Sequence, residues 1–264
     1  MNVLTQSVNK IDFTANGRRF SFKMTYHADN ACDRDMIACF QSEGICEPEV
    51  VLAMERIVKE GDIVIDGGAN IGFFTLLLSQ LVGPKGKVFA IEPGQNNLWK
   101  LEENVRINKA KNVEIIRTPL WKDHDPVTLH LRAEGGRNSL FSGHSQSSTT
   151  VTPCTLGDFP DAAVVKLDIE GAELAAMQFK GALSAPFVIA EMNDFALRCM
   201  GASAAELRRW MEAKWGYITF LLQRDGSLPM LVPGQVNLVA TRQNTNVLFS
   251  NMASVVRAWP EVRV

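Results

Sequence analysis

The stretch 62-DIVIDGGANIGFFTLLLSQL-81 decides the fold, because it joins a short apolar strand to an apolar helix through a glycine-rich turn. In doubly wound α/β sheets, ligands bind beyond the carboxyl ends of the strands, next to such a turn. Here the strand ends in an acid, Asp66, directly before Gly67 and Gly68. The sequence therefore predicts an α/β protein whose ligand tolerates a carboxylate at this position.

The charge of Asp66 distinguishes between ligand classes. At a separation of about 4 Å, two unit charges interact by about 4 kcal/mol at an effective dielectric constant of about 20. Against a pyrophosphate this interaction is a penalty, and against an ammonium group it is a gain. The turn also lacks the GxGxxG spacing of dinucleotide sites. These features favour S-adenosylmethionine, which carries an ammonium group and a nucleoside.

The residues of the turn have separate expected roles toward this ligand. We expect Asp66 to contact its amino group, while backbone N–H groups at the start of the helix meet its carboxylate. Gly68 permits a close approach of the ligand to the backbone, and Gly72 permits tight packing of the helix. Asn70 lies between these glycines and completes the predicted binding turn.

The next predicted strand, 87–92, ends in a second acid, Glu92. A carboxylate at this position accepts hydrogen bonds from both ribose hydroxyls, as in dinucleotide sites, and disfavours a 2′-phosphate. Pro93 and Leu120 are expected to lie on the two faces of the adenine. The alternative for Glu92 is a solvated acid at a strand end.

The pattern around this motif is an alternation of strands and helices. It indicates a mostly parallel sheet with helices on both faces. Two final strands without a helix between them predict an antiparallel end of the sheet. The predicted strands are 63–66, 87–92, 112–118, 127–132, 163–170, 187–192, 217–223 and 237–242, and the predicted helices are 71–81, 96–108, 171–183 and 203–216.

The chain before this alternation predicts an N-terminal segment that covers the site. Apolar residues alternate around Asn16-Gly17, the pattern of a β-hairpin, and helices are expected over 34–44 and from Pro48 onward. The expected domains are an N-terminal segment over 1–60, an S-adenosylmethionine-binding domain over 61–243 and a C-terminal tail over 244–264.

The Gly- and Ser-rich run 133–149 predicts a long loop beside the site. Loops of this length inside a compact domain often act as lids or binding loops. The run contains His144, whose ordinary pKa lies near neutral pH, so this side chain is one hypothetical base for the acceptor. A solvated loop histidine is the alternative.

Composition and charge exclude several classes of protein. The formal net charge is -2, so no global basic field indicates a nucleic-acid partner. No apolar run approaches the ~20 residues that a membrane span needs. The N-terminal MNVLTQSVNK lacks the apolar core of a signal peptide. We expect a cytoplasmic protein without a nucleic-acid or membrane partner, and a homodimer is one option for its oligomeric state.

Three strings resemble the FkbM-type S-adenosylmethionine-dependent methyltransferases: 61-GDIVIDGGANIGFFT-75, 88-VFAIEPGQNNLWKLEENVRIN-108 and 164-VVKLDIEGAEL-174. The resemblance covers roughly residues 45–240, and KLDIEGAE is its most specific part. It implies the Rossmann-like class I methyltransferase fold, with a seven-stranded mostly parallel sheet, an antiparallel last strand and helices on both faces. It also implies O-methylation of natural products, sugars or glycans.

The resemblance adds two cofactor-binding candidates at positions where this chain departs from the family pattern. The family's Tyr-Glu pair before the first helix is Cys46-Glu47 here, which implies a cofactor contact for Glu47. The segment after the third core strand is 118-TPLWKD-123, in which Asp123 is expected to contact the adenine edge.

Methyl transfer is an in-line displacement, so the protein must align the nucleophile, and a hydroxyl acceptor must also lose a proton. Lys166, Asp168 and Glu170 alternate along the predicted strand 163–170 and therefore share one side of it. Charges at the end of a buried strand indicate a pair or a function. We expect Asp168 nearest the methyl group and Lys166 as a second catalytic candidate, with a structural Lys–carboxylate pair as the alternative.

A further catalytic candidate, Glu191, ends the strand 187–192. If the two strands are parallel neighbours, Asp168 and Glu191 lie close together. Oxygen ligands from two strand ends can hold Mg²⁺. The alternative, which the sequence favours, is a hydrogen-bonded carboxylate near the acceptor with no metal.

The sequence therefore predicts an S-adenosylmethionine-dependent methyltransferase that methylates a hydroxyl of a small metabolite, natural product or sugar. Three alternatives remain. The first is N- or C-methylation of a metabolite or peptide, and the second is a non-catalytic cofactor-binding or partner protein. The third is an NAD(P)-linked oxidoreductase, against which Asp66 and the glycine spacing weigh.

Overall fold

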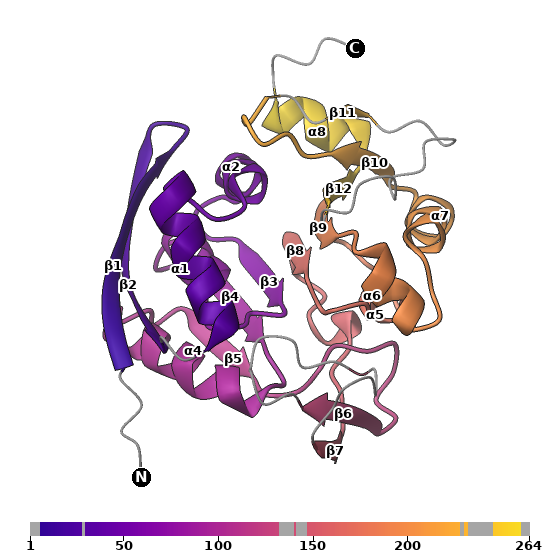
Figure 1. Cartoon of the computed structure of the whole chain (residues 1–264). Helices are drawn as coiled ribbons and strands as arrows, with labels where there is room; N and C mark the ends of the chain where they lie inside the picture. Colours follow the sequence, from indigo (N-terminus) through magenta and orange to yellow (C-terminus); the bar gives the residue numbers. More distant parts are fainter. Residues whose placement is uncertain are drawn as a thin grey trace.

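A computed structural model of the 264-residue chain describes residues 6–27, 30–131, 140, 147–227, 230–231 and 245–259. These residues form a large central sheet with helices on both faces, a long β-hairpin at one side and a small two-stranded sheet (Figure 1). No helix within these ranges is long and apolar enough to cross a membrane.

The large sheet has the strand order β11-β10-β12-β9-β8-β3-β4-β5. Strands β5, β4, β3, β8 and β9 are parallel, whereas β12 is antiparallel to both of its neighbours, β9 and β10. This confirms the predicted seven-stranded sheet with one antiparallel strand, to which the two-residue β11 adds an edge. The strands are β3 (Ile63–Gly67), β4 (Lys87–Ile91), β5 (Val113–Ile116), β8 (Val164–Leu167), β9 (Phe187–Glu191), β10 (Ile218–Leu221), β11 (Met230–Leu231) and β12 (Asn246–Ser250).

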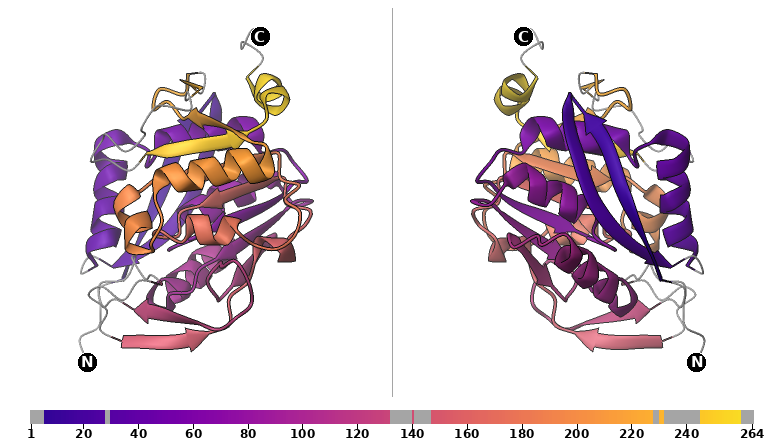
Figure 2. Two further views of the ribbon diagram at one scale, coloured as in Figure 1. Left: turned by 90° about the vertical axis from the view of Figure 1, so that its right-hand side faces the viewer. Right: turned by 90° about the vertical axis from the view of Figure 1, so that its left-hand side faces the viewer.

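Alternating side chains of the buried strands fill two cores. Val64 and Val164 face one core, and Ile65 and Val165 face the other. The first core receives α2, α3 and the hairpin, and the second receives α5 and α7. Figure 2 shows the hairpin across one side of the molecule and α7 across the other. The helices are α1 (Ala31–Glu43), α2 (Pro48–Ile57), α3 (Phe73–Val82), α4 (Gln95–Ile107), the short 3-10 helix η1 (Leu156–Asp158), α5 (Glu173–Met177), α6 (Asp194–Cys199), α7 (Ala204–Trp215) and α8 (Met252–Ala258).

The predicted N-terminal hairpin is confirmed as β1 (Gln6–Ala15) and β2 (Arg18–His27). Asn16 and Gly17 both adopt positive φ, at 46° and 83°, as a tight two-residue turn requires. Phe13 and Phe22 pack against Phe73 of α3, with ring centroids 6.1 and 5.8 Å apart. The hairpin therefore shares a core with the helix that follows the glycine turn, and the division at residue 60 stays a prediction.

Two helix predictions have different outcomes. The helix over 203–216 is confirmed, since the Ser203 side chain accepts a hydrogen bond from Glu206 N and Gly216 ends α7 at a φ of 68°. The helix over 171–183 is shorter than predicted, because α5 spans only Glu173–Met177. Its start is delayed by the turn before it, where Glu170 and Gly171 both have positive φ.

The loop predicted over 133–149 is wrong at its end. Residues from Ser147 onward form β7 (Ser147–Val151), which pairs antiparallel with β6 (Val127–Leu131). Backbone pairing with β6 satisfies the polar groups of this Ser- and Thr-rich run, which side-chain composition alone did not indicate. The rest of the run, apart from residue 140, lies outside the described residues.

The C-terminal tail predicted over 244–264 is also wrong for residues 246–250. These residues form β12, which is buried between β9 and β10. Leu248 faces the first core, while Val247 and Phe249 face the second. The strand predicted over 237–242 lies outside the described residues.

Candidate active site

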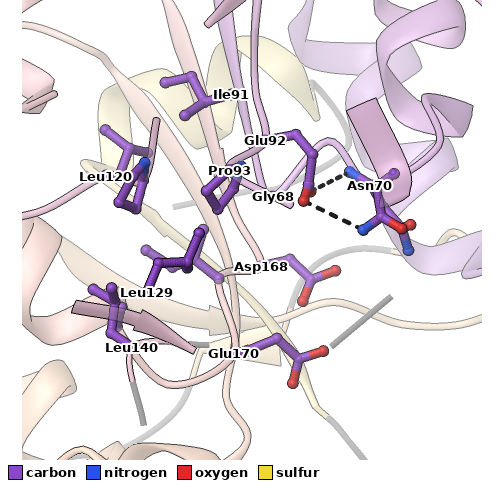
Figure 3. Close-up of a pocket in the computed structure, with 14 residues that line it drawn as sticks. Gly68, Asn70, Ile91, Glu92, Pro93, Leu120, Leu129, Leu140, Asp168 and Glu170 are labelled. Carbon is purple, nitrogen blue, oxygen red and sulfur yellow. Dashed lines mark hydrogen bonds between the residues drawn. The ribbon is translucent and has the colours of Figure 1, made fainter. Parts of the chain in front are cut away.

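A pocket opens at the carboxyl ends of β3, β4 and β8, where parallel sheets of this type bind ligands. Residues that directly follow each of these three strands line it. Figure 3 shows apolar side chains on one side of the pocket and carboxylates toward the other. The lining residues include Gly68, Asn70, Ile91, Glu92, Pro93, Asn97, Leu120, Leu129, Leu140, Asp168, Ile169 and Glu170.

The glycine turn after β3 is shaped by its neighbours in the fold. Gly68 has a φ of 76°, and a Cβ there would lie 1.8 Å from the carbonyl oxygen of Asp168. Gly72 has a φ of 98°, and its Cβ would lie 2.7 Å from Leu101 of α4. Glycine at 68 is therefore required by the approach of the β8 turn, although the residue also lines the pocket. Glycine at 72 serves helix packing, as predicted.

Glu92 lies in the pocket wall with 5% of its surface exposed. Its carboxylate accepts a hydrogen bond from the backbone N–H of Asn70 at 3.0 Å (Figure 3). It also accepts from the backbone N–H of Gly94 (2.8 Å) and from the Asn97 amide (3.3 Å). Burial raises the pKa of Glu92 to about 7, against the effect of these hydrogen bonds. The carboxylate is therefore fixed in place, and Asn70 contributes by holding it.

Pro93 and Leu120 line the apolar side of the same pocket, together with Leu129 of β6 and Leu140 (Figure 3). Sequence reasoning missed Leu129 and Leu140, because nothing local shows that β6 folds back toward β4. It also missed Asn97, whose position in the first turn of α4 after Glu92 was an available signal. The pocket thus combines apolar side chains with a fixed carboxylate.

The structure places Asp66 behind the pocket, and its expected contact with the donor's amino group stays a prediction. Its carboxylate is completely buried and is not among the groups that line the pocket. It accepts a hydrogen bond from the Thr75 hydroxyl at 2.6 Å and lies 3.6 Å from the Lys166 ammonium. Burial raises the pKa of Asp66, and Lys166 and Thr75 oppose this effect. Within the described residues, Asp66 pairs with Lys166 of the neighbouring strand β8, with which it is in register. Asp66 Oδ1 accepts no hydrogen bond from these residues.

Lys166 connects this buried acid to the pocket. Its Nζ lies 3.4 Å from Asp168 Oδ2 and 4.9 Å from the centroid of the Phe74 ring. Burial alone would lower its pKa, but Asp168, Asp66 and Glu47 raise the pKa of Lys166 above its ordinary value. This direction favours a charged ammonium, which can orient the neighbouring carboxylates.

Asp168 lies at the mouth of the pocket, with 31% of its side chain exposed. It follows the last residue of β8, so the predicted alternation holds for Lys166 and Asp168. It does not hold for Glu170, which lies in the turn with a φ of 55°. Glu173, in the next helix, accepts hydrogen bonds from the N–H groups of Ile169 (2.9 Å) and Gly171 (3.3 Å) and so fixes this turn.

Two more acids face this part of the sheet. Glu191 ends β9, the parallel neighbour of β8, as predicted. Burial and then the nearby carboxylates, Asp168 first, raise the pKa of Glu191 to about 9. Glu47 precedes α2 and accepts a hydrogen bond from Asn246 at 3.2 Å. Burial and Asp168 raise the pKa of Glu47 to about 7. Both acids are therefore close enough to Asp168 to influence each other's protonation.

Two residues predicted for the site remain, Asp123 and His144. Asp123 does not line the pocket, and its carboxylate accepts a hydrogen bond from the N–H of Asp125 at 3.2 Å within its own turn. His144 lies outside the described residues. Within the described ranges, no three His, Cys, Asp or Glu side chains are grouped to hold a metal ion, so the magnesium alternative has no preformed ligand set there.

Residues 66–219 match the family model described as the Methyltransferase FkbM domain. The match covers more than half of the chain and begins at Asp66. It includes the pocket residues that follow β3, β4 and β8, and it also includes Glu191.

Similar curated proteins have diverse activities. A tRNA (cytosine(72)-C(5))-methyltransferase from Pyrococcus horikoshii is 36% identical over 78 residues, which are 30% of this chain and 20% of that protein. Hexuronic acid methyltransferase AglP from Haloferax volcanii is 29% identical over 155 residues, which are 56% of this chain and 62% of AglP. In both cases the chain spans less than two thirds of the relative's length.

Among solved structures, the chain is similar to two methyltransferases at low identity. An FkbM methyltransferase from Methylobacillus flagellatus has 17% identity and a TM-score of 0.44, covering 83% of this chain and 60% of that chain. A SAM-dependent O-methyltransferase from Thermotoga maritima has 14% identity and a TM-score of 0.46, covering 90% of this chain and 76% of that chain. At these identities the similarity says nothing about an acceptor.

Proposed function

The chain belongs to the FkbM methyltransferase family, and from this premise we propose that it transfers the methyl group of S-adenosylmethionine to a hydroxyl of a small metabolite, natural product or sugar. One observation carries the proposal. A fixed carboxylate, Glu92, and an apolar wall lie in one pocket with Asp168, which is partly exposed at the pocket mouth.

The donor fits the residues that are present. The Glu92 carboxylate, held by Asn70 and Gly94, can accept hydrogen bonds from the ribose hydroxyls. Pro93 and Leu120 can enclose the adenine between apolar surfaces. A carboxylate at the ribose disfavours a phosphorylated ribose by charge repulsion. The proposed donor contacts are therefore to Glu92, Pro93 and Leu120, with Asp66 supporting them from behind.

When bound, S-adenosylmethionine supplies a methyl group on a positively charged sulfur. Asp168 is the carboxylate of this chain that we place beside that methyl group, and Lys166 orients it from 3.4 Å. Transfer would form a C–O bond as the donor's C–S bond breaks, with the electron pair left on sulfur, and the Asp168 carboxylate would take the hydroxyl proton. Alignment and proton acceptance together lower the barrier.

Glu191 is proposed as an auxiliary group in this step. Burial and the nearby carboxylates raise its pKa to about 9, which favours the protonated form, and a protonated carboxyl could donate a hydrogen bond toward Asp168. It accepts a proton itself only where a neighbouring cation, such as the donor's sulfonium, lowers its pKa. Asp168 is therefore assigned the base role and Glu191 the orienting role.

A sugar acceptor is supported by the name of the relative AglP, a hexuronic acid methyltransferase. The tRNA methyltransferase relative names a C-methylated RNA base instead, and it matches a smaller share of this chain. We therefore propose a small hydroxylated acceptor in a cytoplasmic protein without nucleic-acid or membrane partners. The alternative reaction is N- or C-methylation of a metabolite or peptide.

The experiment incubates the purified protein with S-adenosylmethionine carrying a ¹³C-labelled methyl group and a panel of sugars, hydroxylated metabolites, amines and RNA. Nuclear magnetic resonance locates the label, and an O-methyl signal is the expected result. A label on N or C refutes O-methylation and leaves the donor assignment intact. Calorimetry with S-adenosylhomocysteine and with NADH separates a methyltransferase from a non-catalytic binding protein or an oxidoreductase.

The role of Asp168 has its own test. Asp168→Asn keeps the shape of the side chain but removes the proton acceptor, so turnover is expected to fall by about 100-fold or more, while S-adenosylhomocysteine affinity changes less. Asp161→Asn, at an exposed acid outside the pocket, is the matched control. Equal turnover in the two variants removes Asp168 from the mechanism.

A further inference from the structure

A second large concavity lies at the opposite edge of the sheet from the active site. This basic groove, of about 1260 Å³, runs along the amino ends of β3, β4 and β5. Its walls come from the start of β2, the turn between α3 and β4, and the turn between α4 and β5. The cationic residues that line it are Arg18, Arg19, Lys85, Lys87, Lys109 and Lys111, and its acidic lining residue is Glu114.

Four of the six cations in the basic groove have no acidic partner within the described part of the chain, and one of these four, Arg18, donates instead to the Gln80 carbonyl. Lys87 pairs with Glu114 at 2.6 Å, and Arg19 lies 3.6 Å from Asp12. Lys85, Lys109 and Lys111 are exposed, and no carboxylate among the described residues lies within ion-pair distance of them. A chain with a net charge of -2 therefore concentrates an excess of positive charge in one concave surface.

Helix stabilisation explains only part of this concentration. Lys85 follows the end of α3, and Lys109 and Lys111 follow the end of α4, where cations interact favourably with the helix dipole by about 0.3–1 kcal/mol each. Arg18 also serves a helix end, because it donates to the Gln80 carbonyl in the last turn of α3 at 2.8 Å. Arg19 belongs to the hairpin and follows no helix, yet it lines the same groove. Local helix stabilisation therefore does not explain why six cations line one concave surface.

The floor of the basic groove is already ordered. Ser79 donates to Asn112 at 2.6 Å, and Asn112 in turn donates to the Gly83 carbonyl at 2.8 Å. Gln80 donates to the Ser21 carbonyl at 2.8 Å, which ties α3 to the hairpin. These amides and hydroxyls are satisfied internally, so a ligand meets preformed walls and loses little free energy in ordering them.

Apolar groups complete the surface between the charged rims. The basic groove is also lined by Ile63, Pro84, Ala110 and Val113. Basic rims around a partly apolar floor match a polypeptide segment with carboxylates along its flanks and an apolar side between them. We propose that this groove binds an acidic polypeptide segment of a partner protein.

Other polyanions fit the basic groove less well. Among the residues that the structure describes, no aromatic side chain lines it, whereas single-stranded nucleic acids are usually bound by stacking their bases on aromatic rings. A membrane surface is flat on this scale and cannot fill a concave groove. The exposed large apolar residues of the described chain, Val8, Trp99, Phe195 and Met230, also lie outside it, so nothing there would insert into a bilayer.

The inference is independent of the proposed methyl transfer. The basic groove contains none of the residues assigned to the donor or acceptor. An occupied groove would leave the pocket at the carboxyl ends of the strands open. Binding at the groove would place the enzyme next to a partner without blocking its chemistry.

The test uses a fluorescent peptide of about 20 residues with glutamates on its flanks and leucines on one face. Its binding to the full chain is measured by anisotropy at several salt concentrations. The triple variant Lys85→Glu/Lys109→Glu/Lys111→Glu is compared with Lys122→Glu/Lys180→Glu/Lys214→Glu, which makes the same charge change at exposed lysines outside the groove. Circular dichroism and S-adenosylhomocysteine affinity check that both variants fold.

The proposal expects the wild type and the control variant to bind the peptide, with at least a tenfold loss in the groove variant and weaker binding as salt increases. Equal binding by the two triple variants overturns it, and so does the absence of binding to the wild type. A DNA duplex, a single-stranded oligonucleotide or phosphatidylglycerol vesicles are tested in parallel. If any of these binds the groove more tightly than the peptide does, a polypeptide partner is refuted.

Discussion

The two ends of the strands in the large sheet differ in charge and in how far their charged side chains are exposed to solvent. At the carboxyl ends of β3 and β8, Asp66 and Lys166 are nearly or completely buried and lie 3.6 Å apart. At the amino ends, Lys85 and Lys111 are exposed to solvent. A buried charge depends on its partner, because desolvation is expensive, whereas an exposed charge is stabilised by water. Substitution of a buried charged residue at the carboxyl ends (the active edge) should therefore lower the stability of the protein. Substitution of an exposed lysine at the amino ends (the basic edge) should change it little.

The largest difference between the edges is expected for lysine. Lys166→Met removes the buried cation and leaves Asp66 without its ion pair, so the free energy of unfolding should fall by about 3–5 kcal/mol. Lys85→Met, at the basic edge, should change it by less than about 0.5 kcal/mol. Urea unfolding followed by circular dichroism measures both. Similar losses in the two variants would erase the contrast between the edges.

A smaller effect is expected for Asp66. Asp66→Asn keeps the volume and one acceptor for the Thr75 hydroxyl but removes the negative charge beside Lys166. Since Asp168 still pairs with Lys166, the loss of stability should be about 1–3 kcal/mol. S-adenosylhomocysteine affinity, measured by calorimetry, should fall less than it does in Glu92→Gln. An affinity loss in a fully stable Asp66→Asn protein would restore the direct cofactor contact.

Glu92→Gln separates binding from folding at the active edge. The amide keeps the size of the side chain but has only one acceptor oxygen. It therefore cannot accept hydrogen bonds from both Asn70 and Gly94, and its interaction with the ribose hydroxyls weakens. Affinity for S-adenosylhomocysteine should fall at least about tenfold, which corresponds to about 1.4 kcal/mol. Asn97→Ala is an intermediate control, because it removes the longest of the three hydrogen bonds. Unchanged affinity in Glu92→Gln would place the ribose elsewhere.

The mildest expected effect is a pH dependence. The pKa of Glu191 in the folded chain is raised to about 9 from an ordinary 4.5, so the folded state binds a proton that the unfolded state has released between these values. Its contribution to stability is complete below the unfolded pKa and is lost as pH rises toward 9. The unfolding free energy should therefore decline between pH 6 and pH 9 less steeply in Glu191→Gln than in the wild type. Parallel pH profiles would show that Glu191 is not the group responsible.

Local patterns in the sequence predicted much of the fold, because the spacing of apolar residues and the capping residues indicate its strands and helices. The Asn16-Gly17 hairpin and the Ser203–Gly216 helix follow from two or three residues each. The burial of β12 could not be predicted in this way. Its five residues become a central strand only through pairing with β9 and β10, which are distant in the sequence.

The same limit applies to the site. Glu92 could be placed from sequence, because a residue just past a parallel strand lies at the ligand edge of the sheet. For Asp66 the sequence did not indicate the pairing with the Lys166 ammonium, because that partner comes from the neighbouring strand β8. Leu129 was missed for a related reason, since its strand belongs to a separate two-stranded sheet. The position of a residue along one strand can be predicted from nearby sequence. The side chain that it contacts depends on how distant segments pack together.

The account rests on the assignment of two acids to different tasks, and a crystal structure with S-adenosylhomocysteine tests it most directly. We expect the ribose hydroxyls within hydrogen-bonding distance of Glu92, the adenine between Pro93 and Leu120, and Asp66 still paired with Lys166. A nucleoside bound away from Glu92, or an Asp66 carboxylate that has left Lys166 to contact the ligand's amino group, would contradict the account.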